Sequence, residues 1–175
     1  MRAGGKPSPR MSFKHIFLSS LGGFLGILGI ERVGNALSIG GTEQLFLIGS
    51  FGASAVLVYG VPRAEFSQPR NLFGGHVVSA LVGVTLVQCF GTQYFWIGPL
   101  AVALAIFAMK VTRTVHPPGG ATALIAVIGG QSIRELGFLY PFCPVALGSL
   151  IMITVAVLFN NLSSDQNRNY PSYWW

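Results

Sequence analysis

Charge is scarce in this chain of 175 residues. Only 9% of its residues are charged and 51% are apolar, whereas a soluble domain carries about 25% charged residues. Each acidic residue lies at the edge of an apolar run or between two runs: Glu31, Glu43, Glu65, Glu135 and Asp165. Cation carriers and proton pumps usually place a carboxylate inside the membrane. The composition therefore predicts a membrane protein and disfavours a cation carrier.

Cysteine and the common catalytic motifs are equally sparse. Cys89 and Cys143 have no CxxC partner, so metal and redox motifs are absent and buried packing is the simpler interpretation. The sequence contains no HExxH motif, no P-loop, no Cys/His cluster and no usable Ser-His-Asp arrangement. Lys and Arg are scattered rather than gathered in one patch, which disfavours a nucleic-acid partner. We expect no enzyme, no catalytic residue, no metal and no cofactor.

What the chain has instead is six apolar segments after a basic N-terminal tail. Several of them fall short of the roughly 20 residues that a full membrane span requires. Two interpretations stay open, namely six crossings, or four strong helices with two re-entrant pieces. The segments cover residues 16–30, 44–60, 73–92, 94–109, 115–130 and 140–159.

The positions of Lys and Arg favour six crossings. With the N-terminus inside, six crossings place nine basic residues inside and only two, Arg32 and Arg134, outside. If segments 44–60 and 115–130 do not cross, five lie inside and six outside. Because basic loops stay on the cytoplasmic side, we expect six crossings with both termini in the cytoplasm or the stroma. The nine inside residues are Arg2, Lys6, Arg10, Lys14, Arg63, Arg70, Lys110, Arg113 and Arg168.

A short echo relates the two halves of the chain. Residues 52–58 read GASAVLV and residues 120–126 read GATALIA, at an offset of 68 positions (120 − 52). Three identities and one Ser/Thr exchange fall in this stretch. Because three crossings separate the copies, the second copy would be inverted, as in many secondary transporters. The predicted fold is an all-α membrane protein of about six transmembrane helices in two inverted three-helix repeats.

We expect one transmembrane domain, residues 16–160, between two tails. Repeat one covers about 16–92 and repeat two about 94–160, with a basic tail at 1–15 and a polar linker with an aromatic tail at 161–175. The length suits a single domain. The N-terminus does not resemble a long Ser- and Arg-rich transit peptide, which favours a bacterial or cyanobacterial inner membrane, or a chloroplast membrane for a mature form.

The segments 44–60 and 115–130 are predicted to be broken helices that form the binding site. Pro117 and Pro118 suit a helix start, and a helix start leaves amides unpaired. Glycine lets a ligand approach the backbone, and a helix N-terminus attracts anions. Two such ends, related by inversion, would face each other near the midplane and hold a small anion. The candidate substrate-binding residues are Gly52, Ala53, Ser54, His116, Gly119, Gly120, Ala121 and Thr122.

Two alternatives stay open for these residues. The Gly-Ala-rich strings resemble ordinary faces for close helix packing. A basic stripe at Lys110, Arg113 and His116, spaced three apart, drifts slowly around one helix face and is either an interfacial flank or a cationic path to the site. His116 could also couple a proton to the anion. The candidate access path comprises Lys110, Arg113, Arg70, Asn71 and His76.

The C-terminal end gathers aromatic residues. Trp and Tyr favour the membrane interface, so anchoring of the tail at that interface is the simpler role. Docking of the tail onto a partner subunit is the more specific alternative. The expected partners are the lipid bilayer and a small anion, with a homo-oligomer or a membrane complex as the alternative that the tail suggests. The tail residues concerned are Tyr170, Tyr173, Trp174 and Trp175.

Residues 116–124, reading His-Pro-Pro-Gly-Gly-Ala-Thr-Ala-Leu, resemble the signature of the HPP family of integral membrane proteins. Supporting stretches cover most of the chain from about residue 16 onward: GSFGASAVL at 49–57, QPRN at 68–71 with GGH at 74–76, Met109-Lys110, Asn160-Asn161, and Tyr170-Pro171 with Tyr173-Trp174. The resemblance implies a small membrane protein. It also implies nitrite movement, since plant members are linked to nitrite movement across the chloroplast envelope and cyanobacterial relatives to nitrite uptake.

The leading hypothesis is therefore a transporter or channel for a small inorganic anion, nitrite first. The alternative is a structural or accessory subunit of a larger membrane complex. A third option is a sensor that binds an anion without moving it.

Overall fold

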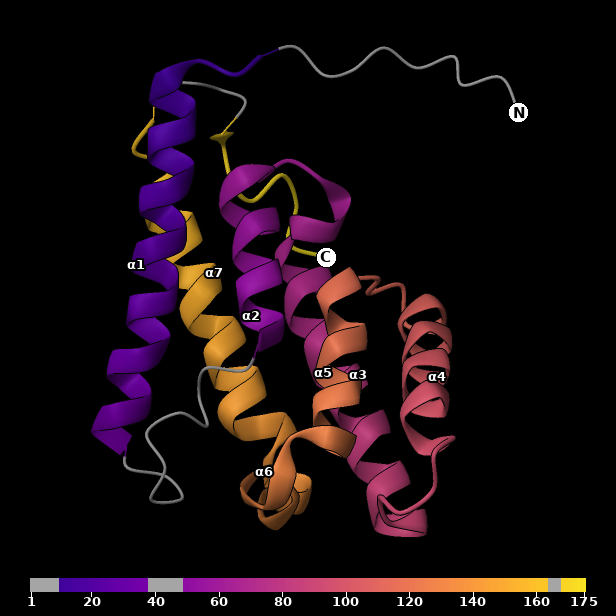
Figure 1. Ribbon diagram of the computed structural model, residues 1–175. Coiled ribbons are helices and arrows are strands. Elements are labelled where there is room, and N and C mark those ends of the chain that lie inside the picture. The colour runs from indigo at the N-terminus through magenta and orange to yellow at the C-terminus, as the bar shows by residue number, and fades with distance from the viewer. Residues whose placement is uncertain (1–9, 38–48, 164–167) are drawn as a thin grey trace.

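The computed structural model describes residues 10–37, 49–163 and 168–175, and all regular structure within these ranges is helical (Figure 1). The predicted all-α class is therefore confirmed. Part of the predicted segment 44–60, namely residues 44–48, lies outside the described residues, as do most of the basic tail and part of the polar linker.

Seven α-helices and four shorter helical turns make up the described part of the chain. The α-helices are α1 (Phe13–Leu37), α2 (Gly49–Ala55), α3 (Pro69–Phe90), α4 (Ile97–Val111), α5 (Pro117–Ile128), α6 (Gly130–Leu136) and α7 (Leu147–Asn160). The shorter pieces are η2 (Val56–Gly60), η3 (Glu65–Ser67), η4 (Gly137–Leu139) and η5 (Pro141–Ala146). η2 continues α2, and η5 leads into α7.

Within the described ranges, six helical segments run alternately between the two ends of the bundle. In Figure 1, α1 runs downward, α2 with η2 upward, α3 downward, α4 upward, α5 downward and α7 upward. Among the described residues, three helices are long and apolar enough to cross a membrane, at 13–37, 69–90 and 141–160, and three shorter apolar helices lie at 49–60, 97–111 and 117–128. The two triplets thus run in opposite directions, as the predicted inverted repeat requires.

Proline fixes where the two helices that carry the histidines begin. Pro69 opens α3 and Pro117 opens α5, positions where the missing N–H costs nothing and the fixed φ suits the helix. His116, just before α5, is extended at φ −138°, because a residue before proline is pushed out of the helical region. His116 therefore lies just outside α5, as the extended residue that precedes its first turn.

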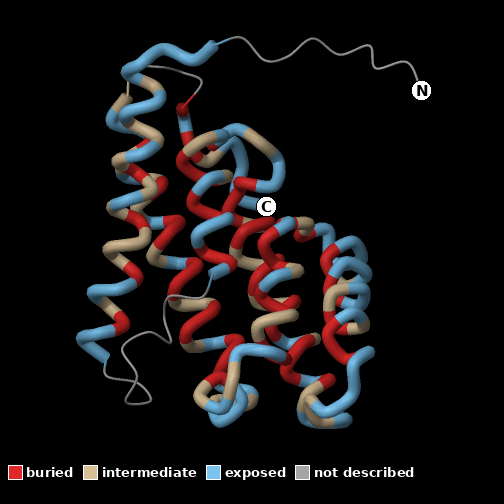
Figure 2. Tube along the Cα trace, viewed as in Figure 1, coloured by how far each residue is buried: buried red, intermediate tan, exposed pale blue. Residues whose placement is uncertain are grey.

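Glycine brings α3 and α5 close together. A Cβ added at Gly83 would lie 2.6 Å from the Ala123 carbonyl oxygen, and one at Gly119 would lie 2.8 Å from the Gly75 carbonyl oxygen. Such backbone contact is typical of membrane helices, whose association relies on close packing. Buried residues concentrate where α2, α3, α5 and α7 meet (Figure 2).

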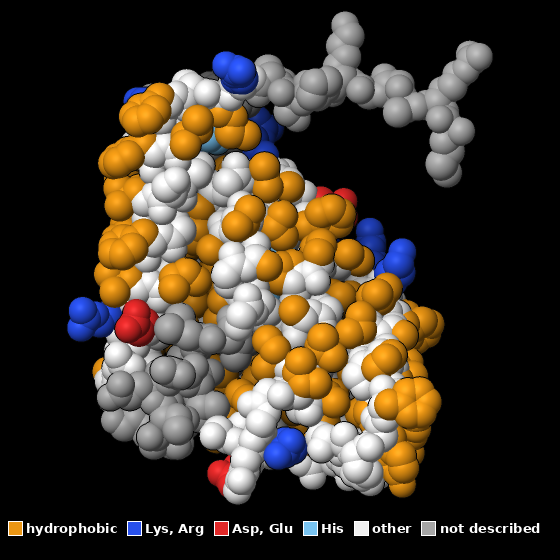
Figure 3. All heavy atoms as spheres, in the orientation of Figure 1, with side chains coloured by type: hydrophobic (Ala, Val, Ile, Leu, Met, Phe, Trp, Pro, Cys, Tyr) orange, Lys and Arg blue, Asp and Glu red, His pale blue; other side chains and the backbone are white. Residues whose placement is uncertain are grey.

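The face shown in Figure 3 is largely apolar, and most of the basic residues visible on it lie in its upper half. Phe24, Val56, Phe107 and Leu158 are each more than 60% exposed, on four different passes. Apolar side chains exposed on all sides of a helix bundle are what lipid contact requires. The chain is an integral membrane protein, with the bundle sides against lipid.

Candidate functional site

Five polar side chains meet in the interior of the bundle. Ser50 and Ser54 come from α2, His76 from α3, and His116 and Thr122 from the start of α5. Each is at most 1% exposed. Buried polar groups are expensive in a membrane protein unless they bond to one another, and a residue of this kind is a functional candidate by default.

Ser54 stands between the two histidines. Its hydroxyl oxygen lies 2.7 Å from Nε2 of His76 and 2.7 Å from Nε2 of His116. The imidazole rings cross edge to face with their centroids 4.8 Å apart. The Ser54 hydroxyl also lies 3.1 Å from the Ser50 carbonyl oxygen, one turn earlier in α2. A single hydroxyl thus joins imidazoles from two other helices.

The outer nitrogens of both imidazoles are bonded as well. Nδ1 of His116 donates to the Phe66 carbonyl at 2.6 Å, because a carbonyl oxygen can only accept. Nδ1 of His76 lies 2.7 Å from Oγ1 of Thr122, and Thr122 in turn donates to Oγ of Ser50 at 2.9 Å. The result is one continuous row of hydrogen bonds from Ser50 to the Phe66 carbonyl.

Further residues support this row from outside it. Tyr140 donates its hydroxyl to the Thr122 carbonyl at 3.2 Å, and the Phe51 ring packs edge to face on His76 at 5.2 Å. Ser79, one turn after His76 on α3, is fully buried, and its hydroxyl has no hydrogen-bond partner among the described residues. A Cβ at Gly119 would lie 2.8 Å from that hydroxyl. Ser79 is therefore an available donor beside the start of α5.

The starts of α2 and α5 lie side by side and antiparallel rather than end to end. Thr122 is level with Ser50, and His116 is level with Ser54, through the bonds described above. Proline has no N–H, so Pro117 and Pro118 offer no amide, and the Gly119 amide bonds to the His116 carbonyl at 2.8 Å. In this structure the available chemistry at the helix starts belongs to side chains more than to amides.

The predicted substrate-binding residues separate into two groups. Ser54, His116, Gly119 and Thr122 are buried around the polar row, and Gly120 is half-buried. Ala53 and Ala121 are exposed on the outside of their helices, and exposed Gly52 lines a separate shallow groove between α1 and α2. The structure therefore brings the side-chain donors together around Gly119 and turns Gly52, Ala53 and Ala121 outward.

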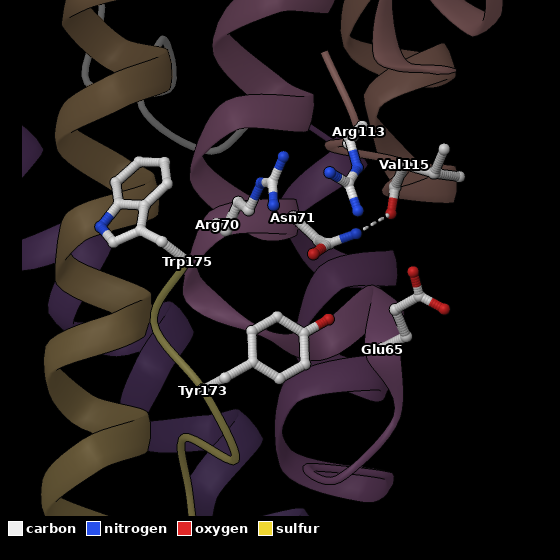
Figure 4. Close-up of a pocket in the computed structure, with 7 residues that line it drawn as sticks. All are labelled: Glu65, Arg70, Asn71, Arg113, Val115, Tyr173 and Trp175. Carbon is white, nitrogen blue, oxygen red and sulfur yellow. Dashed lines mark hydrogen bonds between the residues drawn. The ribbon is translucent and has the colours of Figure 1, made fainter. Parts of the chain in front are cut away.

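Above the polar row lies an open surface pocket of about 420 Å³, lined by residues of the predicted access path (Figure 4). Arg70 and Arg113 approach it from different segments, and Tyr173 reaches in from the C-terminal tail. Partial burial, reinforced by the Glu65 charge and opposed by Arg70, raises the pKa of the Tyr173 hydroxyl, which therefore remains a neutral donor. The lining residues are Glu65, Arg70, Asn71, Arg113, Val115, Tyr173 and Trp175.

The pocket connects to the polar row through the chain just before α5. Asn71 donates its side-chain amide to the Val115 carbonyl at 2.9 Å, and His116 is the next residue. Arg70 donates to the Thr112 carbonyl at 3.2 Å. Lys110 is exposed on α4 and does not line this pocket, whereas His76, predicted on the access path, lies in the polar row itself.

The C-terminal tail folds back on the bundle through Tyr170. The Tyr170 hydroxyl donates to the Ser67 carbonyl at 2.9 Å, and its backbone exchanges two bonds with the Asn161 side chain. Fully buried Arg168 donates to Oδ1 of Asn160 at 2.7 Å. Tyr173, Trp174 and Trp175 remain 39%, 54% and 79% exposed. Of the four aromatic residues singled out in the sequence, Tyr170 thus serves the protein's own fold.

Sequence reasoning missed Ser50, Ser79, Tyr140 and the Phe66 carbonyl. A signal existed for two of them. Ser50 precedes Ser54 by four positions and Ser79 follows His76 by three, and such spacings place side chains on one helix face. Nothing in the sequence pointed to the Phe66 carbonyl or to Tyr140, because their positions depend on tertiary packing.

Comparison with known proteins agrees with this membrane architecture. The HPP transmembrane region matches residues 8–171. Two transmembrane proteins of Dictyostelium discoideum are similar: one is 45% identical over 177 residues, covering 98% of this chain and 55% of that protein, and the other is 40% identical over 173 residues, covering 97% and 59%. The chain thus spans little more than half the length of these curated relatives. No solved structure matches it. The chain belongs to the HPP transmembrane family, as the residues at 116–124 indicated.

Proposed function

We propose that this membrane protein is a transporter or channel for a small inorganic anion, with nitrite the first candidate. The observation that carries the proposal is the buried meeting of hydroxyl and imidazole groups from α2, α3 and α5 beneath a pocket lined by two arginines. The implied nitrite movement of HPP relatives and the pocket chemistry support the same substrate class.

The polar row suits an anion better than a cation. Hydroxyls and imidazole N–H groups donate hydrogen bonds to nitrite oxygens, and helices α2, α3 and α5 contain no Asp or Glu. A cation site in a membrane usually relies on such a carboxylate. Ser79 adds a buried hydroxyl that has no protein partner among the described residues. The anion is proposed to pass beside Ser79, His76 and Thr122.

The pocket supplies the capture step. Arg70 and Arg113 give it two positive charges against one negative charge on Glu65, and convergent positive charge raises the local concentration of anions. Asn71 links this mouth to the segment that carries His116. The basic end of the bundle is proposed to face the cytoplasm or stroma, in a bacterial, cyanobacterial or chloroplast membrane.

The buried part of the path is tested with Thr122→Val, measured as nitrite flux in liposomes that contain the purified protein. Valine keeps the shape but loses the hydroxyl that contacts His76 and Ser50, so we expect flux to fall by tenfold or more, about 1.4 kcal/mol. Thr154→Val is the matched control, because Thr154 bonds only the Leu150 carbonyl on the exposed side of α7.

The mouth is tested with Arg113→Gln, with Arg134→Gln at the opposite end of the bundle as its control. We expect a higher half-saturation concentration for nitrite in Arg113→Gln than in the wild type. This difference should be smallest at high salt, because dissolved ions screen the charge of the arginine. Unchanged flux in both Thr122→Val and Arg113→Gln, from protein that inserts and folds, would remove the proposed path.

A second candidate function is that of a subunit in a larger membrane complex. It is favoured by the exposure of Trp174 and Trp175 beside the anchored part of the tail, since exposed Trp is enriched at interface hot spots. The test is copurification of a partner with the wild-type chain and its loss in Trp174→Ala/Trp175→Ala. Deletion from Tyr170 onward is unsuitable, because Tyr170 holds the protein's own fold.

A further inference from the structure

We propose that His76 and His116 hold one exchangeable proton between them through Ser54, and that anion passage is coupled to the uptake of this proton. The inference rests on the proposed anion transport and adds its coupling ion. It comes from counting the hydrogens available to the polar row. Its contacts of 2.6 to 2.9 Å are hydrogen-bond distances, so each one requires a hydrogen between its two heavy atoms.

Five contacts form the row, and each requires one hydrogen. They join the Phe66 carbonyl to His116, His116 to Ser54, Ser54 to His76, His76 to Thr122, and Thr122 to Ser50. Two neutral imidazoles supply two hydrogens, and Ser54 and Thr122 supply one each. The Ser54 hydroxyl also lies 3.1 Å from the Ser50 carbonyl. When its one hydrogen turns to the row instead, and Thr122 donates to Ser50 as in this structure, the neutral row is one hydrogen short.

One added proton completes the row. His116 then donates from Nδ1 to Phe66 and accepts from Ser54 at Nε2, while His76 donates from Nε2 to Ser54 and from Nδ1 to Thr122. His76 is the imidazolium in this arrangement, and a shift of two hydrogens through Ser54 moves the charge to His116. The pair therefore shares the proton over two short O···N contacts of 2.7 Å.

Without the added proton, the five contacts can be filled by a different arrangement of the hydroxyl hydrogens. If the Ser50 hydroxyl turns to donate to Thr122, Thr122 donates to Nδ1 of His76, and all five contacts are again filled. The loaded and unloaded states thus differ by one proton and by the rotation of two hydroxyls, with no side chain displaced. Each state fills all five contacts of the row, which makes both accessible.

Charge balance links the proton to the anion. An imidazolium in the bundle interior is costly without a counter-charge, and no Asp or Glu occurs in α2, α3, α4, α5, η5 or α7. A bound anion supplies that counter-charge, and the proton in turn offsets the burial of the anion. The other titratable or charged groups on these elements, on η2 and η3 and at the start of η5 are Tyr59, Glu65, Arg70, Cys89, Lys110, Tyr140 and Cys143.

The transport step then moves one proton and one nitrite together. The proton enters from the solution at the Arg70 and Arg113 pocket, forms an N–H bond on the imidazole pair, and leaves on the other side as that bond breaks. Within the pair, the N–H bond of one imidazole and the O–H bond of Ser54 break as an O–H bond on Ser54 and an N–H bond on the other imidazole form, and no other covalent bond changes. A paired movement of one positive and one negative charge is electroneutral, so a pH gradient drives it and a membrane potential does not.

The deciding experiment measures the initial rate of nitrite uptake into proteoliposomes under two separate driving forces. One is a pH gradient, acid outside; the other is a potassium diffusion potential set with valinomycin, inside positive, without a pH gradient. Protein-free liposomes give the background, because nitrous acid itself crosses lipid. We expect a several-fold response to the pH gradient, about one proton taken up per nitrite, and no response to the potential.

Uptake that follows the potential and ignores the pH gradient would overturn the proton coupling while leaving an anion channel in place. If protein-dependent nitrite uptake is absent under both conditions, the proposed function falls as well. The same assay therefore distinguishes a failure of the proton coupling from a failure of the proposed transport function.

Ser54→Ala tests the shared bridge, with Ser149→Ala as the matched control. Both serines are fully buried and bond to a carbonyl one turn earlier, but Ser149 lies on α7 away from the histidines. We expect Ser54→Ala to lose the pH-gradient response, Ser54→Thr to restore it, and Ser149→Ala to keep it. An intact response in Ser54→Ala would overturn the role of Ser54.

Nitrogen-15 spectra of histidine in the unmodified protein give a readout that requires no variant to fold. In bilayers, adding nitrite at neutral pH is expected to convert one buried imidazole from one ring N–H to two. Spectra that do not change with saturating nitrite, in protein that transports it, would overturn the shared proton.

Discussion

Arg113 adopts a backbone conformation that favours glycine. Its φ is 58°, and it follows the C-cap Thr112 of α4, with the next amide, that of Thr114, bonded back to the Met109 carbonyl at 2.9 Å. This is the geometry of a helix stop whose left-handed position glycine usually fills. An arginine held there costs on the order of 1 kcal/mol, and strain of this kind gathers at functional sites.

Arg113→Gly therefore separates stability from function. We expect the variant to unfold at a higher temperature, by up to about 1 kcal/mol of added stability, and to capture nitrite more weakly because one pocket charge is gone. Thermal unfolding in detergent and the half-saturation concentration for flux measure the two effects. Arg113→Asn, which also tolerates this conformation, serves as control. A loss of stability in Arg113→Gly would contradict the strain.

Residue chemistry could be predicted from the sequence only in part. The hydroxyls of Ser54 and Thr122 and the imidazole of His116 were identified because prolines and glycines marked the segments that carry them. His76 was placed on the access path because it follows the polar stretch 68–71, whereas its depth depends on the length of α3 below Pro69. The sequence contains no sign of the 2.7 Å contacts through Ser54, since these depend on how three helices pack.

At the scale of elements, the approach of α5 to α3 decides whether the polar row can form. A Cβ atom added at Gly119 would lie 2.8 Å from both the Gly75 carbonyl oxygen and the Ser79 hydroxyl oxygen, and 2.9 Å from the Met109 sulfur. Gly52, in the corresponding copy, has nothing within 4 Å of that place. The two predicted site glycines thus have different structural roles.

Gly119→Ala is expected to destabilise the fold by about 1–3 kcal/mol, because α5 must move away from α3 to admit the methyl group. Gly52→Ala is expected to be neutral or to stabilise by about 0.5–1 kcal/mol through helix propensity. Thermal unfolding of both variants in the same detergent measures the difference. Equal stability of the two variants would show that the α3–α5 contact is looser than described.

The predicted elements agree with the structure in order and differ at their ends. The segment 94–109 became α4 at 97–111, and 140–159 became η5 with α7 at 141–160. The predicted segment 73–92 begins four residues after the observed start of α3 at Pro69. The prediction followed hydropathy, which excludes the polar residues Arg70 and Asn71. Apolar composition identifies which residues contact lipid or core, but helix ends follow proline and glycine.

At the scale of the whole molecule, the alternating directions of six passes place both described ends of the chain at one end of the bundle (Figure 1). Most of the basic residues lie there too (Figure 3). The charge count predicts that both termini and most basic loops lie on one side of the membrane, because loops rich in Lys and Arg tend to stay in the cytoplasm. The interior could not be anticipated in the same way, since close packing and buried hydrogen bonds appear only after the passes assemble.

Cysteine labelling tests this topology directly. In a background of Cys89→Ser and Cys143→Ser, Gln93→Cys lies exposed after three passes and Trp175→Cys lies exposed after six. We expect a membrane-impermeant maleimide to label Gln93→Cys in intact cells, and Trp175→Cys only after permeabilisation, because loops rich in Lys and Arg favour the cytoplasmic side. The reverse pattern would show that the Arg70 and Arg113 pocket opens outward, and the direction of anion capture would reverse with it. Labelling of both positions in intact cells would contradict an odd number of passes between residues 93 and 175, and with it the antiparallel pairing of α2 and α5 across one membrane.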